Sequence, residues 1–222
     1  MDFRDGGVMK FFVDSADMKE IRTAKSLGMA DGVTTNPTII MKSGRDFAEV
    51  IREIAAVVDG PVAAEPVCSA AADIIKEGRT IASWAENVSV KIPLTEDGLK
   101  AVYALSSEGI STTMTLIFSP AQALLAAKAG ATYICPFAGR LDDISHSGMD
   151  LVAEIMALYG NYPEITTEVI VASVRGPVHV VESAMAGADG VTVPYTVIQK
   201  LIHHPLTDIG IEKFLADWKK IT

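Results

Sequence analysis

The sequence predicts an α/β protein: a single domain folded as a (β/α)8 TIM barrel, with an extra helix at its C-terminus. The main observation is that a short strand-forming run followed by a helical segment recurs eight times along the chain. Such alternation gives parallel strands joined by right-handed crossovers. The second observation is length, because 222 residues are enough to build one barrel of this kind.

The expected strands are short runs rich in β-branched and aromatic residues. They begin near Lys10, Gly32, Val62, Val88, Ser111, Thr132, Glu168 and Gly190. An open, doubly wound sheet is the alternative, but that fold usually has fewer strands, and no glycine-rich dinucleotide loop follows a strand here. The barrel is therefore favoured.

The helices expected between the strands have apolar residues at three- and four-residue spacing, as in residues 46–58. Ser119 with Pro120 gives a start signal for one helix, and Thr95 gives one for another. Glycines fall where helices should end, at Gly28, Gly109, Gly130 and Gly187. A last amphipathic helix is expected over residues 208–220.

No linker, low-complexity block or change of composition divides the chain, so we expect one domain over residues 9–222. Residues 1–8 contain acids and glycines where a signal peptide would need an apolar run. We expect these residues to form a disordered extension. No run of about 18 apolar residues occurs, so no membrane span is expected.

Composition narrows the range of functions. The chain has 28 acidic and 19 basic residues, a formal net charge of −9. This charge repels phosphate backbones and anionic membranes, so we expect neither as a partner. Cys68 and Cys135 are too few for a secreted disulfide framework, which predicts core thiols in a cytoplasmic protein.

The most informative feature is where polar residues interrupt the apolar strands. In VSVKIP, Val88, Val90 and Ile92 share one face of the strand, and Lys91 lies on the other. Apolar side chains should face the helices, which directs Lys91 into the barrel. The same alternation directs further residues inward: Phe12, Asp14, Thr34, Asn36, Ala63, Glu65, Thr113, Thr115, Phe137 and Ser173.

These polar residues lie at or near the C-terminal strand ends, where barrel enzymes assemble their sites. Burial of a lysine among valines disfavours its charged form, and a neutral amine can attack a carbonyl to form a Schiff base. Asp14 and Glu65 are candidates for the proton donor and acceptor, with Thr115 holding water. The alternative is a structural ion pair of Lys91 with Asp14 or Glu65, but such pairs add little net stability. The cluster therefore favours a catalytic site.

Arg140 follows the sixth expected strand and lies in a loop, and Arg175 follows the seventh strand directly. Barrel enzymes often bind phosphate at these late loops. Alternatively, each arginine is a solvated charge or pairs with Asp142 or Asp143. Because both arginines are on the side to which Lys91 points, a phosphorylated small molecule is the predicted substrate.

The histidines give no metal signal. His146, His179, His203 and His204 are scattered and lack metal-ligand spacing, so no metal site is expected. His203 and His204, followed by Pro205, are typical of a helix end. We expect no organic cofactor either.

Three segments carry a resemblance to a known family: VDSAD at 13–17, GVTTNPTII at 32–40 and VSVKIPLTEDGLKA at 88–101. They resemble the small transaldolase-like family, which includes short microbial transaldolases and fructose-6-phosphate aldolases. The likeness covers nearly the whole chain after Met9. It implies a single-domain barrel enzyme that works without a metal or a cofactor.

The resemblance also implies roles for individual residues. Lys91 would form the Schiff base, and Asp14 would take the C4 hydroxyl proton as the C3–C4 bond breaks. Glu65 and Thr115 would hold the water that shuttles protons. The substrate would be bound by Asn36, Thr34, Phe137, Ser173, Arg140 and Arg175, with Asn36 and Ser173 on the dihydroxyacetone hydroxyls and the arginines on the phosphate.

Two positions divide the family. Its aldolases have Gln at the position of Glu65 and Tyr at that of Phe137, so this chain resembles the transaldolase branch. A carboxylate can relay a proton that an amide cannot. A tyrosine hydroxyl can protonate the enamine carbon and release free dihydroxyacetone, whereas a phenylalanine cannot.

The expected reaction converts sedoheptulose 7-phosphate and glyceraldehyde 3-phosphate into erythrose 4-phosphate and fructose 6-phosphate, in the pentose phosphate pathway. A fructose-6-phosphate aldolase and a non-catalytic sugar-phosphate-binding protein are the alternatives. The resemblance further implies a homo-oligomer, commonly a pentamer or decamer, in which the last helix reaches a neighbour. That helix could equally pack on its own barrel.

Overall fold

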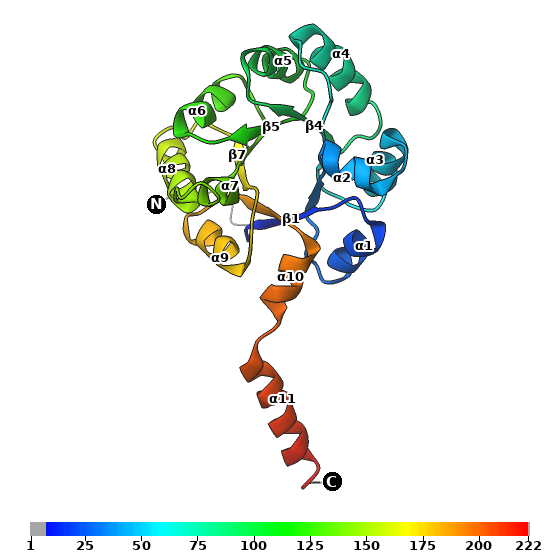
Figure 1. The fold of residues 1–222 in the computed structure, drawn as a ribbon, viewed down its shortest axis with the longest axis vertical. Helices are drawn as coiled ribbons and strands as arrows, with labels where there is room; N and C mark the ends of the chain where they lie inside the picture. The colour runs from blue at the N-terminus through cyan, green and yellow to red at the C-terminus, as the bar shows by residue number, and fades with distance from the viewer. Residues whose placement is uncertain (1–7, 222) are drawn as a thin grey trace.

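The computed structural model describes residues 8–221, over which eight parallel strands close into a barrel (Figure 1). Neighbouring strands follow chain order, and the last strand pairs with the first. The predicted (β/α)8 barrel is therefore confirmed. The disordered extension expected over 1–8 falls outside the described residues, apart from Val8, which is exposed.

Each strand begins within one residue of its expected start. The strands are β1 (Lys10–Asp14), β2 (Gly32–Thr34), β3 (Val62–Ala64), β4 (Val88–Pro93), β5 (Thr112–Ile117), β6 (Tyr133–Pro136), β7 (Glu168–Val171) and β8 (Gly190–Val193). The helices are α1 (Met18–Ser26), α2 (Pro37–Ser43), α3 (Phe47–Ala55), α4 (Ala71–Ala82), α5 (Glu96–Ser107), α6 (Pro120–Lys128), α7 (Ala138–Asp142), α8 (Gly148–Gly160), α9 (Pro177–Met185), α10 (Tyr195–Ile202) and α11 (Pro205–Trp218).

Three strands end before the predicted strand-forming run does, and each end has a local cause. After β3, Pro66 has no backbone N–H to donate to the sheet. After β2, the Asn36 side chain accepts a hydrogen bond from the backbone N–H of Ile39, so it caps α2 instead of extending the strand. After β7, Ser173 has a φ of 59°, in the left-handed region.

Two short helices, α2 and α7, occupy connections in which no helix was predicted. Arg140, expected in a loop, therefore lies in α7. The C-terminal helix begins at Pro205 rather than at residue 208 and ends at Trp218. Its start is fixed by His204, whose ring nitrogen accepts a hydrogen bond from the backbone N–H of Leu206, and by Pro205 in the first turn.

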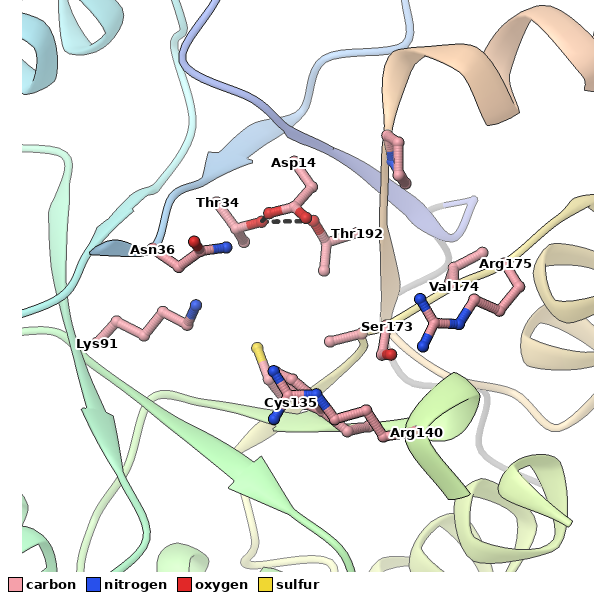
Figure 2. A pocket seen from close by; sticks show the side chains of 13 residues that line it. Asp14, Thr34, Asn36, Lys91, Cys135, Arg140, Ser173, Val174, Arg175 and Thr192 are labelled. Atoms are coloured by element: carbon pink, nitrogen blue, oxygen red, sulfur yellow. Dashed lines mark hydrogen bonds between the residues drawn. The ribbon is translucent and has the colours of Figure 1, made fainter. Parts of the chain in front are cut away.

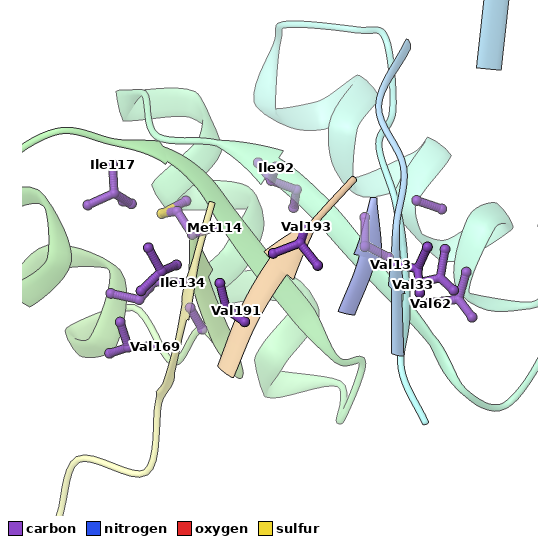
Figure 3. Packing of buried hydrophobic residues seen from close by; sticks show 14 of the residues in the cluster. Val13, Val33, Val62, Ile92, Met114, Ile117, Ile134, Val169, Val191 and Val193 are labelled. Carbon is purple, nitrogen blue, oxygen red and sulfur yellow. The ribbon is translucent and has the colours of Figure 1, made fainter. Parts of the chain in front are cut away.

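The apolar core has two parts. Between strands and helices, the outward-facing strand residues form one continuous layer (Figure 3) that includes Val13, Val33, Val62, Ile92, Met114, Ile134, Val169, Val191 and Val193. Inside the barrel, Phe12, Cys135, Ile170 and Ala172 form a second, smaller cluster. This arrangement confirms the alternation predicted from the strands. The polar residues at the C-terminal strand ends therefore lie over the apolar cluster inside the barrel.

The last helix stands apart from the rest of the molecule. In Figure 1, α11 extends away from the barrel and ends at the C-terminus. Its large apolar side chains are exposed, namely Leu206, Ile209, Ile211, Phe214, Leu215 and Trp218. Over residues 8–221, no helix has the length and apolar character needed to cross a bilayer.

Candidate active site

A cavity of about 200 Å³ opens at the C-terminal ends of the strands (Figure 2). Its lining includes eight of the ten predicted site residues: Asp14, Thr34, Asn36, Lys91, Phe137, Arg140, Ser173 and Arg175. Cys135, Ala172, Val174, Thr192 and Pro194 complete it. The other two predicted residues, Glu65 and Thr115, lie outside this lining, and their contacts are described below.

Lys91 is the most buried charged group at this end of the barrel. It is 5% exposed, and its Nζ donates a hydrogen bond to the backbone carbonyl of Thr35 at 2.9 Å. The Oε2 atom of Glu65 lies 3.2 Å from the same nitrogen. Glu65 thus joins the site through the lysine, within proton-transfer distance of the amine.

Asp14, at the end of β1, accepts a hydrogen bond from the Thr34 hydroxyl at 2.8 Å. Burial raises the pKa of Asp14 above its ordinary value, although the Thr34 hydrogen bond and the charge of Lys91 act in the opposite direction. A buried carboxylate with increased proton affinity is suited to act as a general base.

Thr115 has an unusual position on β5. Its Oγ1 is the one buried side-chain N or O atom among residues 8–221 that has no hydrogen-bond partner. The next residue, Leu116, has a φ of 58°, and the β5–β6 register shifts between Met114 and Ile117. A bulge therefore sets the direction of Thr115, and its orphan hydroxyl fits a bound water or a substrate atom.

Asn36 and Ser173 enter the cavity from opposite sides. The oxygen of the Asn36 side chain is used in the α2 cap, while Figure 2 shows its amide nitrogen directed into the cavity. Ser173 lies after β7 with a left-handed backbone that a non-glycine residue seldom adopts. Strain of this kind is typical of functional sites.

The two arginines are brought together by close packing of α7 on the segment after β7. The backbone N–H of Gly139 donates to the carbonyl of Ser173 at 3.1 Å. A Cβ atom at position 139 would lie 2.1 Å from that carbonyl oxygen and 2.7 Å from Nε of Arg175. Glycine is therefore required here for Arg140 and Arg175 to line one cavity.

The guanidinium groups of Arg140 and Arg175 have different partners. The guanidinium carbon of Arg140 lies 4.9 Å from the centre of the Phe137 ring, a cation–π contact. Arg175 forms an ion pair with Asp143, as the structural alternative from the sequence had it. Both members of that pair are more than half exposed, so a phosphate can compete for the guanidinium.

Sequence reasoning did not place five residues in the cavity lining, and two of them, Thr192 and Cys135, carry a hydroxyl or a thiol. Thr192 and Cys135 line the cavity, and the strand alternation that identified Lys91 applies to both. Cys135 is a core thiol as expected, and burial raises its pKa to about 12. Cys68 packs against the core but is only partly buried, and it donates a hydrogen bond to Glu77.

The metal-ligating residue types do not gather in the part of the chain that the structure describes. No group of three or more His, Cys, Asp or Glu side chains there is placed to hold a metal ion. His179, for example, contacts the single carboxylate of Asp142, at 2.9 Å.

Comparison with known proteins gives the family. The family model described as transaldolase/fructose-6-phosphate aldolase matches residues 11–222. The chain is 60% identical over 213 residues to a protein named "Probable transaldolase" from Aquifex aeolicus, covering 96% of this chain and 98% of that protein. It is 59% identical over 211 residues to a protein of the same name from Methanococcus maripaludis, covering 95% and 98%.

Among solved structures, thiamine phosphate pyrophosphorylase from Pyrococcus furiosus superposes with a TM-score of 0.58 over 87% of this chain and 93% of that chain. At 15% identity, this likeness concerns the barrel fold alone. The family match and the two relatives span almost the entire chain. The chain therefore belongs to the transaldolase/fructose-6-phosphate aldolase family of enzymes.

Proposed function

We propose that this enzyme is a transaldolase that transfers a three-carbon dihydroxyacetone unit between ketose and aldose phosphates through a Schiff base on Lys91. Its substrates are sedoheptulose 7-phosphate and glyceraldehyde 3-phosphate, and its products erythrose 4-phosphate and fructose 6-phosphate, a step of the pentose phosphate pathway. The observation that carries the proposal is the buried Lys91 amine, which shares one cavity with a carboxylate and two guanidinium groups.

Schiff-base formation begins with a neutral amine. Glu65, 3.2 Å from Nζ, accepts the proton of Lys91, and the amine then attacks the C2 carbonyl of the ketose. The carbinolamine oxygen leaves as water after protonation. A water held by the orphan Thr115 hydroxyl and by Glu65 carries that proton.

Cleavage of the C3–C4 bond uses Asp14. Its carboxylate takes the proton of the C4 hydroxyl, and the O–H electron pair forms the aldehyde C=O bond. The C3–C4 electron pair forms the enamine double bond, and the iminium π electrons move onto the nitrogen of Lys91. The aldose phosphate leaves, and an acceptor aldehyde then reverses these steps.

Arg140 and Arg175 bind the substrate phosphate, which exchanges places with Asp143 on the Arg175 guanidinium. Asn36 and Ser173 bind the hydroxyls of the dihydroxyacetone unit. Thr34 orients Asp14, and the Phe137 ring borders the enamine. Small sugar phosphates are thus the partners we propose, with no role for nucleic acid, membranes, metals or organic cofactors.

The distinction from an aldolase depends on the fate of the enamine. Phe137 has no hydroxyl with which to protonate it, and its ring packs against Phe118 with centroids 5.8 Å apart. The enamine therefore persists until an aldose arrives. We expect fructose 6-phosphate to give sedoheptulose 7-phosphate only when erythrose 4-phosphate is present, with little free dihydroxyacetone. Free dihydroxyacetone accumulating without acceptor contradicts the proposal and identifies an aldolase.

Phe137→Tyr sharpens this test. The added hydroxyl supplies a proton to the enamine carbon, so we expect the ratio of free dihydroxyacetone to transfer product to rise severalfold. Tyr162→Phe, at an exposed residue that is not part of the cavity lining, is the control. An unchanged product ratio in Phe137→Tyr overturns the argument from the ring.

We also propose that the enzyme is a homo-oligomer, a pentamer or decamer, in which α11 docks on a second copy. An isolated helix of 14 residues is marginal in water, so exposed apolar residues along α11 need a partner surface. Phe214→Asp should lower the oligomer mass in sedimentation, and an unchanged mass contradicts the docking. The free thiols of Cys68 and Cys135 support the cytoplasm as its compartment.

A further inference from the structure

We propose that Thr192 is a positioning residue for Asp14 and acts on it through the Thr34 hydroxyl. This inference rests on the proposed function, in which Asp14 is the base of the cleavage step. Thr192 lies on β8, far from Asp14 and Thr34 in sequence, and it has no role in the reaction as described above.

The three side chains come from three adjacent strands. Strand β1, which ends at Asp14, lies between β2, which ends at Thr34, and β8, which contains Thr192. The Thr34 Oγ1 is 2.8 Å from Oδ1 of Asp14 and 2.6 Å from Oγ1 of Thr192. Figure 2 shows the two hydroxyls meeting next to the carboxylate. The threonine pair thus bridges β2 and β8 across the inner face of β1.

The number of hydroxyl protons decides which threonine is the donor in this series of hydrogen bonds. A hydroxyl has one proton to donate, and Thr34 donates its proton to the Asp14 carboxylate. Thr192 must therefore be the donor in the bond between the two hydroxyls. Each donation polarises the next, so Thr192 strengthens the hydrogen bond that Thr34 makes to Asp14. It also fixes the rotation of the Thr34 hydroxyl, because both threonines are buried.

The same chain serves both protonation states of the base. When Asp14 has taken the C4 hydroxyl proton, the carboxylic acid can donate to Thr34, and Thr34 can donate to Thr192. The proton stays on Asp14, and only the directions of the two hydrogen bonds reverse. The acceptor aldehyde oxygen recovers that proton when the new C–C bond forms.

Other charged and titratable groups face Asp14 from the surrounding elements. Lys91 on β4 favours the ionised carboxylate, and Glu65 after β3 is paired with that lysine. Cys135 on β6 has a raised pKa and stays neutral. Arg140 of α7 and Arg175 after β7 line the same cavity. These groups are the same in a Thr192 variant, so the effect of the hydroxyl can be isolated.

The test uses the full chain and three variants. Thr192→Val removes the hydroxyl at nearly constant volume, and Thr192→Ser retains it. Thr113→Val is the matched control, because Thr113 is similarly buried and shares a 2.7 Å hydroxyl pair with Ser89 on the opposite side of the barrel from β1. Thermal unfolding of all three variants measures any purely structural effect.

The first readout is titration of Asp14 in the substrate-free protein, followed by the ¹³C shift of its carboxyl carbon. In Thr192→Val the hydrogen bond from Thr34 to the ionised carboxylate is weaker. We therefore expect the titration midpoint of Asp14 to move to higher pH by about 0.5–1 unit, a three- to tenfold change in proton affinity. Thr192→Ser and Thr113→Val should titrate as the unaltered chain does. An unchanged midpoint in Thr192→Val overturns the inference.

The second readout is the pH profile of kcat for transfer from fructose 6-phosphate to erythrose 4-phosphate. In Thr192→Val we expect kcat near neutral pH to fall about five- to tenfold and the acid limb to move to higher pH. KM and the rate of borohydride trapping should stay unchanged, because Lys91 is unaffected. Equal losses in Thr192→Val and Thr113→Val, or no recovery in Thr192→Ser, contradict the positioning role.

The two proposals fail in different ways. If the unaltered chain shows no transfer activity, the proposed function is wrong. The Asp14 titration is then the measurement that confirms or contradicts the effect of Thr192.

Discussion

Two lysine–glutamate pairs lie inside this barrel, one at each end. At the N-terminal end, Nζ of Lys10 donates to both carboxylate oxygens of Glu168, at 2.8 and 2.7 Å. At the C-terminal end, Nζ of Lys91 lies 3.2 Å from one oxygen of Glu65. The side chains of the first pair are 42% and 29% exposed, and those of the second are 7% and 12% exposed.

The two ends of the barrel differ in whether their polar groups all have hydrogen-bond partners. Burial lowers the pKa of Lys10, but its hydrogen bonds to Glu168 and the charge of that carboxylate outweigh burial and raise it. The N-terminal pair is therefore a satisfied, charged contact. At the C-terminal end, Lys91 lines a cavity, and the buried hydroxyl of Thr115 on the neighbouring strand has no hydrogen-bond partner among the described residues. The lysine–glutamate pair is thus a structural contact at the N-terminal end, whereas at the C-terminal end its lysine lines an open cavity.

The largest expected effect on activity comes from replacing Lys91, with the same replacement at Lys10 for comparison. Lys91→Met should abolish transfer, a loss of about 10⁴-fold or more, because no nucleophile remains to form the Schiff base. Lys10→Met should keep kcat and KM and cost at most about 1 kcal/mol of stability, as expected for a partly exposed pair. Steady-state kinetics and urea unfolding measure both. Retention of activity in Lys91→Met would contradict the proposed catalytic role of the C-terminal lysine.

The next prediction separates the two carboxylates. Asp14→Asn should lower kcat about 10²- to 10⁴-fold through loss of the base. It should also stabilise the fold at neutral pH, because burial raises the pKa of Asp14 and ionisation is then costly in the folded state. Glu168→Gln should do the opposite, with activity kept and stability reduced by up to about 1 kcal/mol.

The sign of this pH dependence follows from proton binding. Above the ordinary Asp value of 3.8, the unfolded chain has released a proton that folded Asp14 still holds. The contribution of Asp14 to stability is therefore present at low pH and lost as pH rises through its folded pKa. Thermal unfolding of the unaltered chain and of Asp14→Asn should diverge as pH rises through this window. Parallel curves would show that Asp14 is not buried as described.

A smaller effect, on KM, is expected where Arg140 and Arg175 line the cavity. In Gly139→Ala the added Cβ clashes with the Ser173 carbonyl, so α7 must shift and separate Arg140 from Arg175. KM for fructose 6-phosphate should rise about tenfold, while KM for unphosphorylated fructose stays the same. Gly160→Ala is the matched control, since a Cβ there meets no atom within 4 Å. Equal changes in KM for both sugars contradict phosphate binding by these arginines.

The interior of the barrel could be predicted from the sequence because strand geometry has a period of two. Once the valines of β4 are assigned to the helix-facing layer, Lys91 can only point inward, and the same holds for Asp14 on β1. Thr192 obeyed this rule too, between Val191 and Val193, but an isolated threonine in an apolar strand gave no signal of chemistry. Its importance comes from its contact with Thr34, a residue 158 positions away.

The connections after the strands could not be predicted in the same way. Helix α7 depends on contacts between segments distant in sequence, such as Gly139 with Ser173. Local pattern contains no information about such contacts. The amphipathic C-terminal helix was expected, but its pattern could not decide between projection toward a neighbour and packing on its own barrel, because the same apolar face suits both.

Trapping of the Schiff base shows whether Lys91 is the nucleophile. The full chain is incubated with fructose 6-phosphate, reduced with borohydride, digested and analysed by mass spectrometry. We expect one reduced adduct, on Lys91, with the mass of the three-carbon unit or of the intact sugar phosphate. No adduct, or an adduct on Lys10 or a surface lysine instead, would contradict the account.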